Sequence, residues 1–293
     1  MDLETWACPT CFSRLEAVGD KLRCIREGRA FSRYGGVPVL LRPEDEGLLQ
    51  AADAYTAAWK RDALAPPKGA ALDLPYVPSP YWKPKARSLE ALLRILGPAS
   101  GRKLADMGAG TGWLSYRLTE AGFRCYATDV TADADVGLGA AAAYQRTAHG
   151  FERSIASLTR WPFLDASLDV AVCNASLHYL RDIRPALSEA GRALKPGGSL
   201  VAMNDPIHTD PKSAHRAAYD FQNRMRDGGG TGALVEGHRH FVATELEADL
   251  RAEFPRVTRH DPDYGPGFRV TRAIKSFFLR MELASFPIYV AQR

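Results

Sequence analysis

The sequence has no long apolar run, no leader-like start and no strong net charge, and each absence argues against one class of function. No stretch of the 293 residues approaches the roughly 20 apolar residues that a membrane-spanning helix needs. The acidic start MDLETWACPTC lacks the basic-then-apolar order of a signal peptide, so we expect a cytoplasmic protein without a membrane partner. A formal net charge of +4 does not require a nucleic-acid partner. Five cysteines are an odd number, which argues against a complete disulfide framework.

A chain of 293 residues is long enough for one large domain and one small one. Apolar residues make up 46% of the chain and charged residues 25%, which is ordinary for a globular protein with a normal core. We divide the chain into a small segment, 1–42, a helical and proline-rich linker or cap, 43–84, and a large domain, 85–293. Apolar residues at helical spacing between 48 and 59 are followed by prolines that prevent a regular element: Pro66, Pro67, Pro75, Pro78, Pro80 and Pro84.

The large domain alternates strand-like and helix-like patterns. Strands are predicted at 103–107, 124–128, 168–173 and 199–203, and helices at 88–96, 113–121, 136–146 and 183–194. A capping box at 244–247 predicts a helix that continues to about residue 254, and 286–291 is predicted as a last strand. This alternation predicts an α/β fold, in which helices cover both faces of a parallel sheet.

A glycine-rich loop follows the first strand of the large domain. It reads Asp106-Met107-Gly108-Ala109-Gly110-Thr111-Gly112, and its glycines let the backbone turn sharply and approach a ligand. Ligands in such sheets bind beyond the carboxyl ends of the strands, where the next helix presents unpaired N–H groups. The loop departs from the G-x-G-x-x-G of dinucleotide-binding domains, and its leading acid suits the ammonium group of an amino-acid ligand. Asp129, at the end of the next strand, can bind both hydroxyls of a ribose, although alone it could equally be a surface acid.

Five segments between residues 100 and 200 together resemble the class I S-adenosyl-L-methionine (SAM)-dependent methyltransferases. Besides the loop and Asp129, they are 161–169 (WPFLDASLD), 174–179 (NASLHY) and 194–200 (LKPGGSL). The segments especially resemble small-molecule enzymes such as those of ubiquinone and menaquinone biosynthesis. It implies SAM as the cofactor and a Rossmann-like sheet of seven strands with the last one antiparallel, which agrees with a strand at 286–291.

The resemblance also implies roles for single positions. The loop would hold the methionine part of SAM, Asp129 the ribose, and Val130 would pack on the adenine. Family members often carry an acid five residues before the proline of their L-P-F motif, against the adenine amino group, but that position here is Ser157. Asn174 and Ala175 would lie near the sulfonium. The implied cofactor-binding set is Asp106, Gly108, Ala109, Gly110, Gly112, Asp129, Val130, Ser157, Leu158, Asn174 and Ala175.

Few catalytic residues are expected, because a methyl group on a sulfonium is already electrophilic. The enzyme mainly aligns the acceptor about 3 Å from the methyl carbon and excludes water. A base is needed only if the acceptor must lose a proton. His178, where the resembling family often has histidine, and His208, after the fifth strand, are the catalytic candidates. The alternative for His178 is a structural histidine bonded to the backbone.

Two additions to the sheet, 55–85 and 206–241, are expected to shape the acceptor pocket. Tyr81 and Trp82 in the first and Tyr219 in the second are the candidate substrate contacts, although each could equally pack on the core. The second addition contains a glycine-rich hinge at 228–232 and is expected to form a lid. His238 and His240, in its polar end, are expected to be exposed. We expect a small, aromatic or apolar acceptor.

Three cysteines near the N-terminus have the spacing of half a zinc ribbon. The turn Cys8-Pro9-Thr10-Cys11 can hold a tetrahedral metal between two thiolates, and Cys24 can add a third ligand. With 35–41 (GGVPVLL), the segment resembles a small zinc-ribbon family that partners or is fused to methyltransferases. A fourth cysteine would fall near Glu27. Glu27 as an uncommon ligand, a ligand such as histidine from elsewhere, and a degenerate ribbon without metal all stay open.

Two other functions stay open as well, and the oligomeric state is not predicted. An RNA methyltransferase is one, because a ribosomal-RNA guanine methyltransferase family joins an N-terminal zinc ribbon to this fold; the near-neutral charge argues against it. A SAM-binding regulatory protein without catalysis is the other. A pocket from which the arginines of the lid point away would favour a small acceptor, and an open basic groove would favour RNA; these arginines are Arg216, Arg224, Arg226 and Arg239.

Overall fold

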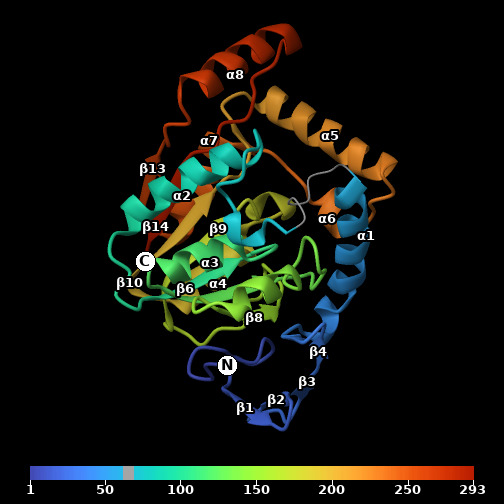
Figure 1. Cartoon of the computed structure of the whole chain (residues 1–293), viewed down its shortest axis with the longest axis vertical. Coiled ribbons are helices and arrows are strands. Elements are labelled where there is room, and N and C mark those ends of the chain that lie inside the picture. Colours follow the sequence, from blue (N-terminus) through green and yellow to red (C-terminus); the bar gives the residue numbers. More distant parts are fainter. Residues whose placement is uncertain (62–68) are drawn as a thin grey trace.

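A seven-stranded sheet forms the centre of the computed structural model, which describes residues 1–61 and 69–293 (Figure 1). The strand order is β13-β14-β10-β9-β6-β7-β8. The five strands from β10 to β8 pair in parallel, and β14 runs antiparallel to β10 and to β13. The strands are β6 (Lys103–Met107), β7 (Arg124–Asp129), β8 (Glu152–Ile155), β9 (Leu168–Asn174), β10 (Leu194–Met203), β13 (Arg256–His260) and β14 (Ile288–Gln292).

Helices cover both faces of this sheet, because successive residues of its central strands point to opposite faces and are apolar on both. Leu104 and Val172 face one side, where they join a buried cluster with α2 (Trp82–Leu96) and α3 (Trp113–Glu120). Met107 and Cys173 face the other side, towards α4 (Arg184–Ala193) and α7 (Ala243–Glu253). The α/β fold and the antiparallel last strand predicted from the sequence are therefore confirmed.

One predicted helix is wrong in type. Residues 136–146 form only a short 3-10 element, η3 (Ala140–Arg146). The cause is close packing just before it, where a Cβ on Gly139 would lie 2.3 Å from the carbonyl oxygen of Ala132 and one on Gly137 would lie 2.7 Å from that of Thr131. The glycines are pressed against the loop after β7, and a regular helix starting at 136 does not fit there.

The N-terminal segment docks on the β8 edge of the sheet. It contains a three-stranded antiparallel sheet and a small hairpin, and its fully buried Trp6 stacks on Phe163 with ring centroids 4.8 Å apart. The backbone N–H of Leu40 donates to the carbonyl oxygen of Ile155 at 2.8 Å, which continues the sheet beyond β8. The strands are β1 (Leu15–Val18), β2 (Lys21–Cys24), β3 (Ala30–Phe31), β4 (Arg33–Tyr34) and β5 (Val37–Pro38).

The remaining elements lie beyond the carboxyl ends of the parallel strands. There α1 (Gly47–Arg61) packs against α5 (Pro211–Asp227) and α6 (Ala233–Glu236), and β11 (Ile207–His208) pairs in parallel with β12 (Phe241–Val242). In Figure 1, α8 (Pro266–Leu279) lies at the end of the molecule opposite the N-terminal segment. Three further 3-10 turns are η1 (Pro43–Asp45), η2 (Ala71–Asp73) and η4 (Leu177–Tyr179).

Pro66 and Pro67 of the predicted proline-rich loop lie outside the described residues. Across the described residues, 1–61 and 69–293, none of the helices has both the length and the apolar character to span a bilayer.

Candidate functional site

One cavity of about 740 Å³ opens where β6, β7 and β9 end. Its floor is made by the glycine-rich loop and the residues that follow the other two strands, and α1, α5, α6 and the start of α2 contribute its walls. The volume lies within the range of roughly 300–1,000 Å³ that is usual for pockets that bury a small ligand. The cavity therefore brings together the loop at 106–112 and the additions at 55–85 and 206–241.

The glycine-rich loop is held tightly between two neighbouring strand ends. The N–H groups of Gly108 and Ala109 both donate to the carbonyl oxygen of Thr128 at 2.8 Å. Gly108 has a φ of +76°, and a Cβ on it would lie 2.5 Å from the Cβ of Ser176. The Ser176 hydroxyl in turn donates to the carbonyl oxygen of Met107 at 2.7 Å. Only glycine fits at 108, and the cradle it leaves faces the cavity.

Asp129 lines the cavity and binds the loop at the same time. Its Oδ2 accepts from the N–H of Gly110 at 2.7 Å, and its Oδ1 accepts from the N–H of Thr131 at 3.1 Å. Burial raises the pKa of this carboxyl above its usual range. A carboxylate has about four lone-pair positions, so both oxygens can accept further hydrogen bonds from a ligand.

Asp106 and Gly112 lie behind the cavity and do not line it. Asp106 is fully buried; its Oδ2 accepts from the Ser115 hydroxyl at 2.8 Å, and its Oδ1 has no partner among the described residues. Burial raises its pKa to about 7. A Cβ on Gly112 would lie 2.5 Å from the ring of Phe151, so this glycine permits packing of the helix start. Direct contact of these two residues with a cofactor stays a prediction.

The other residues of the expected cofactor set line the cavity, together with the three loop residues 108–110. They are held by local contacts: Asn174 accepts from the side-chain amide of Asn204 at 2.7 Å, and the N–H of Ala175 donates to the carbonyl oxygen of Met203 at 2.7 Å. These residues are Val130, Ser157, Leu158, Asn174 and Ala175.

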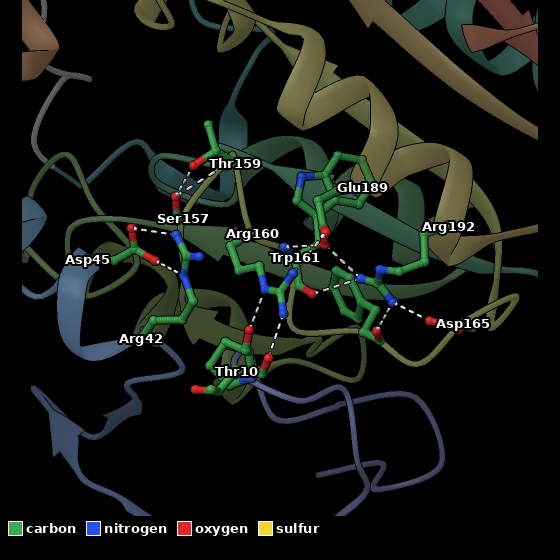
Figure 2. A network of polar contacts seen from close by, with 12 residues as sticks. Thr10, Arg42, Asp45, Ser157, Thr159, Arg160, Trp161, Asp165, Glu189 and Arg192 are labelled. Carbon is green, nitrogen blue, oxygen red and sulfur yellow. Dashed lines mark hydrogen bonds and ion pairs between the residues drawn. The ribbon is translucent and has the colours of Figure 1, made fainter.

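An acid that sequence reasoning missed reaches the same cavity from the start of the linker that follows the N-terminal segment. Asp45, in η1, lines the cavity with Ser157 and Thr159, and its two oxygens bind the guanidinium of Arg42 at 2.6 and 3.1 Å. Figure 2 shows this ion pair beside Ser157 and Thr159. No pattern in the sequence marked it, because residue 43 was interpreted only as the start of the linker.

Figure 2 also shows how the N-terminal segment is attached to this part of the fold. The Arg160 guanidinium donates to the carbonyl oxygens of Pro9 and Thr10. Arg160 and Arg192 both lie over the ring of Phe12, at 3.7 and 3.6 Å from its centroid. The residues around Cys8 and Cys11 are thus tied to the loop that carries Ser157 and Thr159.

His178 stands at the other end of the cavity, in contact with a buried carboxylate. Its Nδ1 lies 2.7 Å from Oδ1 of Asp205, and its backbone N–H donates to the same oxygen at 3.2 Å. Both side chains are buried, and His178 lines the cavity. The partner of the ring is therefore a side chain and not the backbone. Sequence reasoning named the histidine but missed Asp205, which lies 27 positions further along the chain.

His238 and His240 are not exposed, contrary to expectation, and both line the cavity. His238 is 4% exposed and stacks on Phe221 with ring centroids 3.8 Å apart, while its edge faces His178 at 4.9 Å. Burial lowers the pKa of His238 far below its usual range and that of His240 to about 3. The pairing of β11 with β12 explains the error, because it draws the end of the lid against the sheet.

His208 is buried but does not line the cavity. Its Nε2 lies 2.9 Å from Nδ1 of His240, so it acts on the cavity only through that ring. Burial lowers the pKa of His208. A direct catalytic role for His208 stays a prediction; in this structure it is His240 that lines the cavity.

Of the three expected substrate contacts, Tyr81 and Trp82 line the cavity and Tyr219 does not. Tyr219 is 62% exposed, on the outer side of α5, whereas Phe221 of the same helix lines the cavity. The helical period of 3.6 residues places these two side chains about 200° apart. Further aromatic residues line the cavity, among them Tyr55 and Tyr179, whose hydroxyl oxygens are 2.5 Å apart.

Most arginines of the lid point away from the cavity. Arg216 lies 4.0 Å from Asp220, Arg239 lies 3.7 Å from Glu245, and Arg226 bonds to Asn223 and Gln222 on its own helix. Arg224 lines the cavity, as does Lys85, whose ammonium lies 4.6 Å from the ring centroid of Tyr81. In the described part of the chain, the lining thus contains two cations and no basic row, which favours a small acceptor.

The three N-terminal cysteines meet Glu27 in one cluster. One ligand atom from each of Cys8, Cys11, Cys24 and Glu27 lies within 4.8 Å of all the others. The Sγ atoms of Cys11 and Cys24 are 3.5 Å apart, and Oε2 of Glu27 is 3.8 Å from Sγ of Cys8. Ligands at about 2.3 Å from a tetrahedral zinc are separated by roughly 3.8 Å, so the cluster has the size of a zinc site. No histidine belongs to it.

Comparison with known proteins agrees with the fold and the loop. Residues 105–202 match a family described as a methyltransferase domain. Over 121 residues the chain is 34% identical to demethylmenaquinone methyltransferase from Mycolicibacterium paratuberculosis, which covers 41% of this chain and 46% of that protein. Over 133 residues it is 30% identical to a ubiquinone/menaquinone biosynthesis C-methyltransferase from Roseobacter denitrificans, covering 45% and 52%. The chain thus spans about half the length of the curated relatives it matches.

Solved structures share the fold at low sequence identity. Geranyl diphosphate C-methyltransferase from Streptomyces coelicolor superposes with a TM-score of 0.53 at 17% identity, covering 86% of this chain and 98% of that one. Phosphoethanolamine N-methyltransferase 2 from Haemonchus contortus, solved with S-adenosyl-L-methionine, superposes with a TM-score of 0.55 at 12% identity, covering 76% and 56%. At such identities the likeness supports the fold alone.

Proposed function

We propose that this chain, which contains a class I SAM-dependent methyltransferase domain, transfers the methyl group of SAM to a small, uncharged aromatic or apolar acceptor. One observation carries the proposal: the glycine-rich loop and Asp129 open into the same cavity as a wall of aromatic and uncharged histidine side chains. A cofactor half and an acceptor half are thus joined in one pocket. One curated relative is named for demethylmenaquinone and another for ubiquinone/menaquinone biosynthesis, which supports an acceptor of this class.

The residues around the loop fit SAM, judged from their contacts. The cradle at Gly108 has no room for a side chain, and the Asp129 oxygens keep free lone pairs beside it. We assign the methionine part to residues 108–110 and the ribose to Asp129. Val130 and Leu158 would enclose the adenine. Asp45, which lines the cavity with Ser157, would supply the carboxylate that position 157 lacks.

At the acceptor end, His178 is the proposed base and Asp205 its positioning partner. A carboxylate 2.7 Å from Nδ1 favours the tautomer that carries its proton on Nδ1, which leaves the Nε2 lone pair for a proton of the acceptor. SAM supplies an electrophilic methyl carbon. The acceptor atom forms the new bond to that carbon, the electron pair of the broken S–C bond stays on sulfur, and the acceptor proton moves to His178. The surrounding rings exclude water from the step.

Labelled SAM tests this function with two acceptor pools, uncharged hydroxylated naphthalenes and total RNA. We expect label in the first pool. Asp205→Asn should lower transfer at least about tenfold, because the amide can donate to Nδ1 and favours the wrong tautomer. Tyr219→Phe is the matched control, since Tyr219 is exposed away from the cavity. SAM affinity, measured by calorimetry, should stay unchanged in both variants.

The outcomes separate the alternatives. If label appears only in RNA, the acceptor is RNA and not a small molecule. SAM binding without transfer to either pool would favour a binding protein over an enzyme. Full transfer by Asp205→Asn would remove His178 and Asp205 from the mechanism and leave the methyltransferase assignment in place.

We further propose that residues 1–42 form a zinc-binding unit with Cys8, Cys11, Cys24 and Glu27 as ligands. The support is the four-atom cluster and its size. Elemental analysis should find about one zinc per chain in the wild type and in Asp20→Asn, an exposed control in the same segment. Zinc should be lost in Cys8→Ser and held at least about tenfold more weakly in Glu27→Gln. A folded wild-type protein without metal, even after incubation with zinc, would contradict the proposal.

A further inference from the structure

Helix α8 carries an exposed apolar face, two residues of which, Phe277 and Phe278, also line a hollow with Asp210 and Ser213. None of its residues is buried. Phe277 and Phe278 are 79% and 77% exposed, and Val270 and Ile274 are more than half exposed. At 100° per residue these four side chains share one side of the helix. The usual arrangement, in which the apolar stripe of a surface helix faces the core, is therefore reversed.

The opposite side of α8 is attached to the protein by specific contacts. Arg272 donates to the carbonyl oxygens of Leu283 and Ala284, and its guanidinium lies over the ring of Phe268. The Ser276 hydroxyl donates to the carbonyl oxygen of Met281 at 2.7 Å. These three side chains, 268, 272 and 276, are spaced by four residues and form the inner face. The contacts hold the helix with its apolar face outward.

The charges of α8 are of one sign. From 266 to 281 the sequence is PGFRVTRAIKSFFLRM, with four cations and no acid. Arg269 and Lys275 flank the apolar face on either side, and both are exposed. Asp263 lies before the helix, 3.9 Å from Arg269, and Glu282 after it accepts from the N–H groups of Thr209 and Asp210. An apolar stripe between exposed cations is the arrangement of helices that lie on anionic bilayers.

The segment that leads into the helix contacts the cavity lining. Tyr264, just before it, donates to the carbonyl oxygen of Phe286 at 2.6 Å, and Phe286 lines the cavity. The Tyr264 hydroxyl is also 3.1 Å from that of Ser88, which donates to Asn204, another lining residue. The segment before the helix therefore contacts residues that line the proposed active site or are bonded to the lining.

We infer that the outer face of α8, made by Val270, Ile274, Phe277 and Phe278, binds the surface of an anionic lipid bilayer. The phenylalanines would enter the region between headgroups and acyl chains, while Arg269 and Lys275 meet the lipid phosphates. A second copy of the chain fits less well. The exposed apolar area of one such helix is roughly 400–600 Å², below the about 800 Å² per partner of a standard protein interface.

Vesicle sedimentation with the full chain tests this inference, and it needs neither SAM nor an acceptor. We expect binding to phosphatidylglycerol-rich vesicles and at least tenfold less to pure phosphatidylcholine. The double substitution Phe277→Ser with Phe278→Ser should lower binding at least tenfold, as should Arg269→Glu with Lys275→Glu. Ile25→Ser, at an exposed apolar position of the N-terminal segment, is the control and should bind like the wild type.

Three results would overturn the inference. One is equal binding of the wild type and the phenylalanine double variant to the anionic vesicles. Another is a dimer in light scattering that the same double variant converts to a monomer, without vesicle binding by the wild type. The third is a clear decrease of the melting temperature in that variant, which would mean that the face packs against other residues of the same chain. An unchanged melting temperature of the phenylalanine double variant together with lost vesicle binding supports the inference.

Discussion

Asp129 offers the sharpest test of the cofactor site, because its carboxylate has two separable tasks. In the structure it accepts one hydrogen bond from the loop and one from Thr131, at 2.7 and 3.1 Å. In the proposed complex it also accepts two from the ribose. Hydrogen bonds to a charged group contribute about 1.5–3 kcal/mol each, so Asp129→Ala should weaken SAM binding by at least about 1.4 kcal/mol, or tenfold. Two full bonds set an upper limit of about 6 kcal/mol.

Calorimetry with SAM and thermal unfolding without it separate the two tasks. Asp129→Asn is the matched variant, because its amide keeps the size of the side chain and one accepting oxygen. We expect Asn to bind SAM more tightly than Ala and more weakly than Asp. Both variants should unfold at a lower temperature than the wild type, since the N–H groups of Gly110 and Thr131 lose charged partners. If both variants keep the fold and bind SAM as the wild type does, Asp129 does not hold the ribose and the site assignment is wrong.

Three further predictions concern residues in and around the cavity wall. Gly108→Ala should destabilise the fold by about 1–3 kcal/mol and weaken SAM binding, because its Cβ would lie 2.5 Å from that of Ser176. Gly110→Ala has 3.6 Å to its nearest neighbour and should cost only about 1 kcal/mol of backbone strain. Urea unfolding of both variants measures the difference. Burial raises the pKa of Asp106 from 3.8 to about 7. Between about pH 4 and pH 7 the folded state therefore keeps a proton on this carboxyl that the unfolded state has lost. The free energy of unfolding falls as pH rises through this range. Asp106→Asn removes that contribution, so it should be more stabilising at pH 8 than at pH 5 by on the order of 2–3 kcal/mol, and an equal effect at both pH values would contradict a protonated Asp106. His238→Phe should leave the melting temperature unchanged or raise it, because both ring nitrogens are buried without a partner in the described residues; a clear loss of stability would show that they are bonded.

The parts of this protein that could be predicted depend on residues close together in the sequence. Alternating apolar periods determined the order of strands and helices, and the glycines at 108, 110 and 112 marked the loop at the end of β6. Each property follows from a local rule of backbone geometry, so a window of a few residues is enough. The C-x-x-C turn is of the same kind, and the structure brings its cysteines to Cys24 and Glu27.

Tertiary structure alone decided which side chains share the cavity. Asp45 lies more than 100 positions from Ser157, yet both line it, and Asp205 reaches His178 only because η4 and the loop after β10 follow neighbouring strands. His238 is polar and was expected in water, but the pairing of β11 with β12 buries it against Phe221. Helix α8 is the opposite case. Its apolar residues recur at helical spacing, as in a helix packed on a core, but its contacts with the rest of the chain leave that face exposed. Burial and the direction of a face depend on contacts between distant residues, and no local pattern encodes them.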